Sequence, residues 1–419
     1  MKYKKTVFYI LFLFFSTTFS QQLSEIVDTR IGTKGESLAC GYSFIGATYP
    51  FGMVQFTPSF FSPQKGFVVT QLSGAGCSNM GNFPVVPMAG NLKDSPFNMN
   101  SLDPFESVNN ASAGYLSVNS KDDITSRLTV TKRSAIAQFK FKNSKKGTII
   151  IGSGVNSSDA KHIKNSEINI TSSTTCEGFT EGGDFCGTET PYKVYFAAEF
   201  DRPANELGTW SGNELTQSLI NKGKNSGAFF TFSTENNNEV NYRIAISFVS
   251  IENAKENLMS EKLNTSFDGY LTNTQNVWNK HLSKIKISTT NDDKKIQFYT
   301  NFYHSLIHPN IVSDINGDYM GADFKVYNNS NGKEHYSSFS VWDTYRTQAQ
   351  LLAMLFPKES SEMMQSLVNF AEQAGGYGRW ILANIETGIM QGDPTPILIS
   401  NSFAFGAKDF DHKKAYKYM

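Results

Sequence analysis

The stretch "RLTVTKRSAIAQFKFKN", residues 127–143, carries the pattern that decides the fold of the first part of this chain. Apolar and polar side chains alternate on both sides of a short polar break at Lys132 and Arg133. Successive side chains of a β-strand point to opposite faces, so this alternation predicts strands that bury one face.

Comparable runs recur from about residue 22 to about residue 260, and clusters of Gly, Asn, Ser and Asp separate them. Short strands joined by turn residues at this spacing are typical of antiparallel sheets packed face to face. We therefore predict an antiparallel β-sandwich over residues 21–262. The clearest further runs are "GTIIIGSG" (147–154), "YKVYFAAEF" (192–200), "GAFFTFST" (227–234) and "NYRIAISFVS" (241–250).

The periodicity changes at about residue 263. The segment "SFDGYLTNTQNVWNKHLSKI", residues 266–285, has helical spacing of its apolar side chains and predicts a helix that leaves the sandwich. The following "KIKISTT", residues 284–290, predicts a short strand. Residues 263–290 are therefore interpreted as a linker.

Residues 291–419 consist mainly of segments with helical periodicity. We expect one helix to begin at Ser360 or Ser361 and to stop at Gly375. Helices joined by Gly-rich loops after a sandwich favour an α/α barrel, which makes the fold class α+β with more than one domain. The sequence ends at Met419 within a helical segment, and about five helices leave inward faces without partners, so we expect the barrel to be truncated.

The first twenty residues have the layout of a secretory signal peptide. A basic start precedes the apolar run "VFYILFLFF" (7–15), and we expect cleavage near Ser20. That run is too short for an ordinary transmembrane helix, so we expect a secreted or periplasmic protein with no membrane partner. The 38 basic residues balance the 38 acidic ones, and nothing in this balance indicates binding to nucleic acid.

Four cysteines in an exported chain permit two disulfides. Cys176 and Cys186 bracket the Gly-containing segment "CEGFTEGGDFC", so a disulfide between them is possible. Cys40 and Cys77 would then form the second pair, although other pairings and free cysteines remain open. The absence of a CxxC or His/Cys cluster argues against zinc.

A candidate binding segment is "FSVWDTYRTQAQLLAMLFP", residues 339–357. A buried helix is predicted from Thr347, yet Trp342, Asp343 and Arg346 stand at its entrance. One interpretation is a carboxylate at a helix N-terminus with an Asp343–Arg346 pair on the helix surface. The other is the polar floor of a pocket, where the same pair holds a sugar.

A second candidate is "GGYGRWILANIETGIMQGD", residues 375–393. Trp380 could stack on a sugar ring, while Glu386 and Asp393 could bind its hydroxyl groups. The alternative is that both acids cap helices. The Gly-rich segment 31–58, which contains Phe44, is interpreted either as a packed loop or as a loop that stacks on sugar.

Two further clusters resemble metal sites only superficially. His304 and His308 are four residues apart on one predicted helical face, but the glutamate of HExxH is missing, and we favour packed, hydrogen-bonded histidines. Asp314, Asp318 and Asp323 do not meet the EF-hand pattern, and a solvated turn is expected there.

Several segments, in this order and spacing, resemble glycoside hydrolase family 92, the calcium-dependent exo-acting α-mannosidases. The resemblance runs from about residue 25 to Met419. The motifs are "IGT…GYSFIGATYPFGMVQFTP", "LSGAGCSNMGNFPVVP", "FCG…YKVYFAAEFDRP", "FYTNFYHSLIHPNIVSDINGDY", "FSVWDTYRTQAQLLAMLFP" and "GGYGRWILANIETGIMQGD…FAFGAKDFD".

The resemblance implies a β-sandwich followed by an (α/α)6 barrel, and an inverting, calcium-dependent release of terminal α-linked mannose from glycans. It places Asp343 and Arg346 in the subsite of the terminal mannose, with Trp342 as packing support and Phe44 on a sandwich loop over the barrel mouth. The general acid, the general base and most Ca2+ ligands are expected beyond Met419. The 419-residue chain is therefore expected to be inactive by itself. The alternative is a non-catalytic saccharide-binding or degenerate relative.

Overall fold

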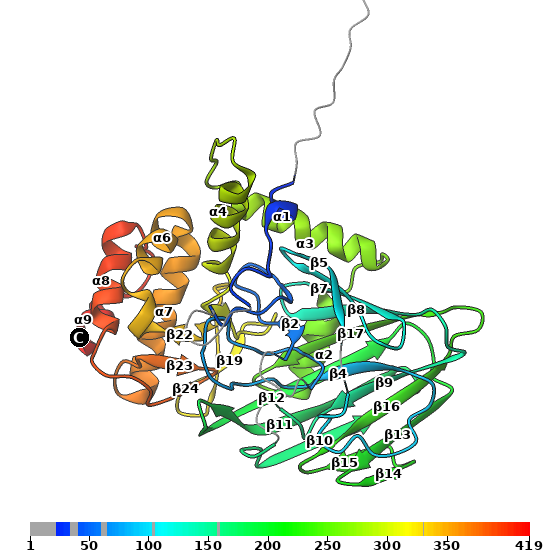
Figure 1. The fold of residues 1–419 in the computed structure, drawn as a ribbon. Helices are drawn as coiled ribbons and strands as arrows, with labels where there is room; N and C mark the ends of the chain where they lie inside the picture. Colours follow the sequence, from blue (N-terminus) through cyan, green and yellow to red (C-terminus); the bar gives the residue numbers. More distant parts are fainter. Residues whose placement is uncertain (1–21, 34–40, 60–64, 103–104, 157–159, 330) are drawn as a thin grey trace, which may run out of the picture.

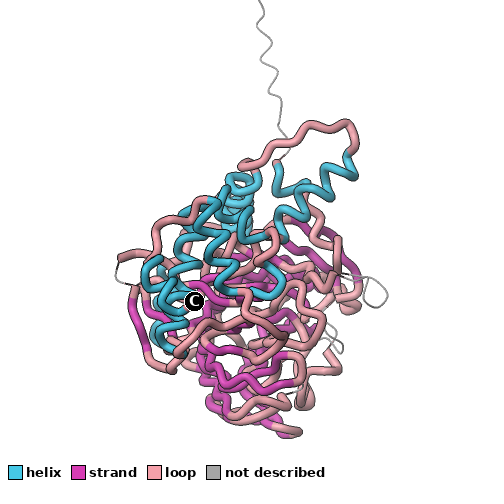
Figure 2. Tube along the Cα trace, turned by 90° about the vertical axis from the view of Figure 1, so that its left-hand side faces the viewer, coloured by secondary structure: helices cyan, strands magenta, loops and turns pink. Residues whose placement is uncertain are grey.

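The computed structural model describes residues 22–33, 41–59, 65–102, 105–156, 160–329 and 331–419. The predicted signal peptide and Cys40 lie outside these residues. The described chain forms two large antiparallel sheets followed by a helical part, which confirms the predicted sandwich and the helices after it (Figure 1). Figure 2 shows most of the helices gathered in the upper half of the view and most of the strands below them.

The two sheets are built from strands far apart in the sequence. One sheet contains, in spatial order, β1 (Ala47–Thr48), β2 (Gln55–Pro58), β3 (Phe67–Val68), β4 (Val85–Ala89), β9 (Lys146–Gly152), β16 (Ser226–Ser233), β13 (Glu206–Ser211) and β14 (Glu214–Thr216). The other contains β15 (Ile220–Lys222), β10 (Asn165–Ile170), β11 (Thr175–Phe185), β12 (Thr188–Phe200), β17 (Glu239–Ser247), β8 (Ser134–Phe141), β7 (Ile124–Val130), β6 (Tyr115–Asn119) and β5 (Ser107–Ser112).

The opening stretch forms most of the β7–β8 hairpin. Leu128 lies opposite Ala137, and the tight turn is closed by a hydrogen bond from the Thr131 N–H to the Ser134 carbonyl. The alternating side chains of both strands, Leu128 and Phe139 among them, are fully buried in the core. Each large apolar side chain buried in this way contributes ~1.5–3 kcal/mol to folding, which is why the alternation fixes the register.

The polar break in the same stretch joins the sandwich to the helical part. The Arg133 guanidinium is almost fully buried and lies 2.7 Å from the carboxylate of Glu334, which Lys132 also contacts. The Arg133 Nε atom also donates to the Ser313 carbonyl at 3.0 Å. A buried charge requires such partners, so this turn packs where the Glu334 carboxylate can pair with the Arg133 guanidinium.

Two helices connect the halves. Helix α2 (Ile251–Ser260) packs Ala254 and Leu258 on the outer face of the second sheet. Helix α3 (Phe267–Leu282) confirms the predicted linker helix, and its buried Trp278 donates to the Thr48 carbonyl at 2.7 Å. The predicted strand at residues 284–290 is wrong: this segment alternates in burial but pairs with no strand in the described structure.

The helical part confirms most of the predicted segments. Helix α7 begins at Pro357, three or four residues before the expected start, because proline suits the first turn of a helix, and it ends where Gly375 adopts a φ of +83°. The helices after α3 are α4 (Asp292–His304), α5 (Val341–Thr344), α6 (Gln348–Leu355), α7 (Pro357–Ala374), α8 (Thr395–Phe405) and α9 (His412–Tyr418), and the short α1 (Leu23–Ile26) precedes the first strand. Among the described helices, none has the length and apolar character needed to cross a bilayer.

Short strands fix the loops between these helices. The pair that matters for the site is β22 (Phe339–Ser340) with β23 (Trp380–Leu382), where Ser340 lies opposite Trp380. The other short strands are β18 (Asn310–Ile311), β21 (Tyr336–Ser337), β19 (Asp318–Met320), β20 (Val326–Asn328) and β24 (Ile385–Glu386).

The predicted disulfide between Cys176 and Cys186 is wrong. Cys176 is a buried free cysteine, and Cys186 bonds to Cys77, with the two Cα atoms 4.9 Å apart. The segment read as a loop is strand β11, and ten residues of extended chain separate Cys176 from Cys186 by roughly 30 Å. The pairing of Cys77 with Cys186 also excludes the alternative bond between Cys40 and Cys77.

Candidate functional site

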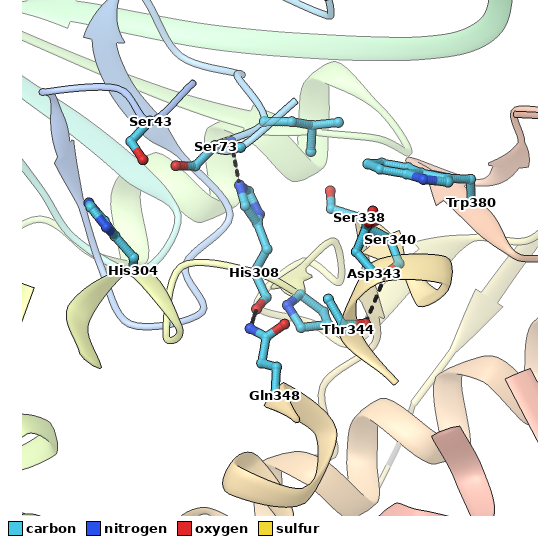
Figure 3. Close-up of a pocket in the computed structure, with 13 residues that line it drawn as sticks. Ser43, Ser73, His304, His308, Ser338, Ser340, Asp343, Thr344, Gln348 and Trp380 are labelled. Carbon is cyan, nitrogen blue, oxygen red and sulfur yellow. Dashed lines mark hydrogen bonds between the residues drawn. The ribbon is translucent and has the colours of Figure 1, made fainter. Parts of the chain in front are cut away.

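A pocket of about 280 Å³ lies where two sandwich loops meet the chain between α4 and α6. Figure 3 shows Ser43 and Trp380 on opposite sides of this pocket, with His308 between them. The residues that line it are Ser43, Leu72, Ser73, Gly74, His304, His308, Pro309, Ser338, Ser340, Asp343, Thr344, Gln348 and Trp380. Hydroxyl groups, one carboxylate and one indole therefore share a space large enough for a monosaccharide.

Asp343 supplies the carboxylate. It lies in the single turn of α5, and its side chain accepts a hydrogen bond from the Ser340 hydroxyl. The strand β22 ends at Ser340, so the β22–β23 pairing places Asp343 and Trp380 at the same pocket. The carboxylate of Asp343 is exposed and can accept hydrogen bonds from a ligand.

Arg346 does not pair with Asp343. No ion pair between the two side chains occurs in the described structure, and the exposed guanidinium lies 5.1 Å from the ring centroids of both Trp342 and Tyr345. The expected Asp343–Arg346 ion pair on the helix surface is therefore wrong, and the role of the two residues in holding a sugar stays a prediction. Three-residue spacing brings side chains together along a continuous helix, but α5 ends at Thr344 and α6 starts at Gln348.

Trp380 lines the pocket and is 9% exposed, and its Nε1 atom has no hydrogen-bond partner in the described structure. Its ring packs against Phe185 at the tip of the β11–β12 hairpin, with centroids 4.8 Å apart. The indole thus gives the pocket an apolar surface, while its buried N–H is left without a partner among the described residues.

Glu386 supports this tryptophan and does not line the pocket. Its Oε2 atom accepts from the backbone N–H groups of Arg379 at 2.8 Å and Trp380 at 3.2 Å, and its Oε1 atom accepts from that of Gly388 at 3.1 Å. The second expected acid, Asp393, is exposed and outside the pocket. The two acids expected to bind hydroxyls are thus not brought together in this pocket.

Phe44 and Trp342 are packing residues. Phe44 is 2% exposed and belongs to the hydrophobic core, while its neighbour Ser43 lines the pocket. Trp342 is half-buried against the same core. Of the seven expected binding residues, Asp343 and Trp380 line the pocket, and Trp342, Arg346, Phe44, Glu386 and Asp393 do not.

The two histidines lie in the pocket but not on one helical face. Helix α4 ends at His304, and His308 follows in a turn before a cis proline. The His308 Nε2 atom accepts from the Ser73 N–H at 3.1 Å, so its Nδ1 atom carries the proton toward the Asn310 side-chain oxygen at 3.2 Å. Burial lowers the pKa of His304 and of His308 to about 4, so both imidazoles are neutral near pH 7.

Several lining residues had no signal in the sequence. Ser43, Ser73 and Ser338 are ordinary serines of loops, and only the Gly-rich character of the segments around Ser43 and Ser73 indicated surface loops. Gln348 was part of a predicted helix. Its Nε2 atom donates to the carbonyls of Ser305 and His308, both at 2.8 Å, and so fixes the turn that carries His308.

Metal-ligating side chains do not cluster in the described part of the chain. Calcium takes six to eight oxygen ligands, whereas no group of three or more His, Cys, Asp or Glu side chains that could hold a metal occurs in the described part of the chain. Asp314, expected in a solvated turn, is 1% exposed and hydrogen-bonded to protein groups, because it lies at the junction with α2. Asp343 is the one carboxylate among the described lining residues.

Solved structures with this fold include α-mannosidases. The chain aligns with the GH92 α-mannosidase BT3965 from Bacteroides thetaiotaomicron at a TM-score of 0.86 and 24% identity, over 95% of this chain and 56% of that one. The same protein in complex with mannoimidazole aligns at a TM-score of 0.85 and 25% identity, over 95% of this chain and 55% of that one. The inverting mannosidase BT2199 from the same species, strain VPI-5482, aligns at a TM-score of 0.83 and 22% identity, over 95% of this chain and 55% of that one.

The fold is therefore that of a glycoside hydrolase. The chain belongs to glycosyl hydrolase family 92: residues 26–247 match the family model described as its N-terminal domain, and residues 253–419 match that of its catalytic domain. Among curated proteins, the sequence has no match. The chain spans little more than half the length of the solved relatives.

Proposed function

We propose that this chain provides the sandwich and the first part of the catalytic domain of an exported α-mannosidase. The substrate is a terminal α-linked mannose of a glycan, and the mechanism is inverting and calcium-dependent. The observation that carries the proposal is the pocket between sandwich and helices, with Asp343 and Trp380 on one wall. Family membership and the mannosidase structures with the same fold support it.

In this proposal Asp343 accepts hydrogen bonds from sugar hydroxyls, and the hydroxyls of Ser43 and Ser338 serve as further donors and acceptors. Trp380 offers the surface of its indole ring. A bound calcium ion would polarise substrate oxygens, and its ligands belong outside the described residues of this chain.

Inverting hydrolysis uses two carboxyl groups, roughly 6.5–9.5 Å apart, as general acid and general base. Asp343 is the one carboxylate among the described lining residues, so we propose that the 419-residue chain binds mannosides without turning them over. This single carboxylate also favours a second candidate, a non-catalytic saccharide-binding relative.

Calorimetric titration of the purified chain with methyl α-D-mannopyranoside tests the proposal, with methyl α-D-glucopyranoside as the matched epimer. Saturable, mannose-selective binding is expected, together with no release of mannose from an α-mannobiose. Equal or absent binding of both glycosides would contradict the proposed substrate, and mannose release by the chain would contradict its inactivity. Calcium-dependent hydrolysis of α-mannosides by a longer natural form would favour the enzyme over the non-catalytic saccharide-binding relative.

A further inference from the structure

The β11–β12 hairpin extends from the sandwich to the pocket. The hairpin turns at Cys186 and Gly187, which both adopt positive φ angles of 54° and 82°. Phe185, immediately before the turn, is 1% exposed and packs against the pocket indole of Trp380. The hairpin tip therefore forms the backing of one pocket wall.

The same hairpin tip holds the loop of the facing wall. Leu72, Ser73 and Gly74 line the pocket. A few residues later the loop meets the tip, where the Cys186 N–H donates to the Ser78 carbonyl at 2.9 Å and the Cys77–Cys186 disulfide closes the contact. Two pocket walls are thus attached to one hairpin tip.

We infer that the Cys77–Cys186 disulfide is a positioning element of the saccharide pocket. It fixes the 72–80 loop against the hairpin that supports Trp380, and so sets the width between the two walls. The Ser73 N–H is then held where it donates to His308 Nε2, which links a third wall to the same loop. The inference rests on the proposed function for the identity of the ligand.

The loop needs such a restraint because its own sequence is permissive. Gly74 has a φ of +88° and open space where a Cβ would lie, so this residue is held by the bond from its N–H to the Tyr42 carbonyl and not by side-chain packing. Hydrogen bonds also join the loop to the tip, such as the 3.1 Å bond from the Met80 N–H to the Asp184 carbonyl. Each bond of this kind is individually weak in water.

The restraint is also removable. Cys186 is exposed and Cys77 is half-buried, so a dithiol reductant can reach the bond. Dithiothreitol would transfer two electrons and two protons: the S–S bond breaks, two cysteine thiols form, and the reductant closes into a cyclic disulfide. Buried Cys176 is already a thiol and takes no part.

The experiment compares the oxidised protein, the same protein in dithiothreitol, and the double variant C77S/C186S, all well below their unfolding temperatures. Hydrogen–deuterium exchange is followed in peptides covering residues 69–82 and 377–388, and the affinity for methyl α-D-mannopyranoside is measured in parallel. Cys176→Ala in the same hairpin is the matched cysteine control, and Ile244→Val in the sandwich core controls for a general loss of stability.

We expect faster exchange in both peptides and about tenfold weaker binding when the bond is absent, with both controls close to the oxidised protein. Unchanged exchange at residues 69–82 would overturn the inference, as would faster exchange with unchanged affinity. If the double variant does not fold, the dithiothreitol sample decides. If the oxidised protein binds no mannoside, the proposed function fails, and the exchange data alone decide whether the disulfide positions the walls.

Discussion

The side-chain amide of Asn257 donates to the carboxylate of Asp314 at 2.7 Å and joins helix α2 to the helical part of the chain. The Asn257 oxygen accepts from the Ile315 N–H at 2.9 Å, so both ends of this amide are used. Asp314 also accepts from the Ser247 hydroxyl and from the amide of Asn253. Burial raises the pKa of Asp314 to about 6, which makes these donors necessary for its ionised form.

Replacement of Asn257 by alanine should lower the free energy of unfolding by ~1–3 kcal/mol, because the buried Oδ1 atom of Asp314 loses its Asn257 donor and the Ile315 N–H loses its acceptor. Urea denaturation measures this loss. Asn273→Ala, on the exposed face of helix α3, is the matched control and should change stability by less than about 0.5 kcal/mol. Equal losses in both variants would show that the junction does not depend on this amide.

Stability should rise with pH between about 4.5 and 6.5. Burial lowers the pKa of His304 and His308 to about 4 and that of His335 to about 3, so over this range the unfolded chain binds protons that the folded chain does not. Asp314, with its raised pKa, acts in the opposite direction, because only its unfolded form has lost its proton there. Three histidines outweigh one aspartate, so the net slope is positive.

His335→Phe tests this slope, since phenylalanine keeps the ring that stacks on Tyr319 at 3.7 Å and removes the titrating group. The slope of unfolding free energy against pH should fall by up to about 1.4 kcal/mol per pH unit. Tyr319→Phe alters the same stack without removing a group that titrates in this range, and should keep the slope. An unchanged slope in His335→Phe would remove His335 from the explanation.

Asp343→Asn should weaken the binding of methyl α-D-mannopyranoside by about tenfold or more, because a charged acceptor in the pocket becomes a neutral amide. Asp343 is exposed, so the variant should fold normally. Asp393→Asn, exposed and outside the pocket, is the control and should bind like the parent chain. Calorimetric titration distinguishes the two, and equal affinities would place the sugar away from Asp343.

Glu386→Gln should act on the loop and not directly on the sugar. Its carboxylate accepts from the N–H groups of Arg379, Trp380 and Gly388. Loss of its charge should weaken these hydrogen bonds and lower the free energy of unfolding by about 1 kcal/mol. Hydrogen exchange of residues 379–388 should therefore become faster. Loss of mannoside binding without faster exchange would instead indicate a direct contact between Glu386 and the ligand.

The sequence predicted the elements because their patterns are local. Alternation in residues 127–143 required strands with one buried face, and the glycine at 375 required a helix end where φ becomes positive. The linker helix was equally clear. The prediction of a strand at 284–290 is wrong because a strand needs a hydrogen-bonded partner, and this segment has none in the described structure. A local pattern does not show whether a partner strand is available.

The site was predicted only in part, because neighbours in the sequence do not share an environment. Asp343 and Trp380 meet through the β22–β23 pairing, while Arg346 beside Asp343 points at aromatic rings. Glu386 was identified as a polar residue of the right loop, but its carboxylate is used by backbone N–H groups.

The sequence by itself determined a β-sandwich followed by helices, and its ordered motifs indicated the family, since both depend on residue type and spacing along the chain. Only the tertiary structure decided that Cys77 bonds to Cys186, that Asp314 is buried at a junction, and that serines from two sandwich loops complete the pocket. These features join residues that are tens to hundreds of positions apart. Their distances are set by how the sheets and helices pack, and that packing is a property of the whole core and not of any one segment.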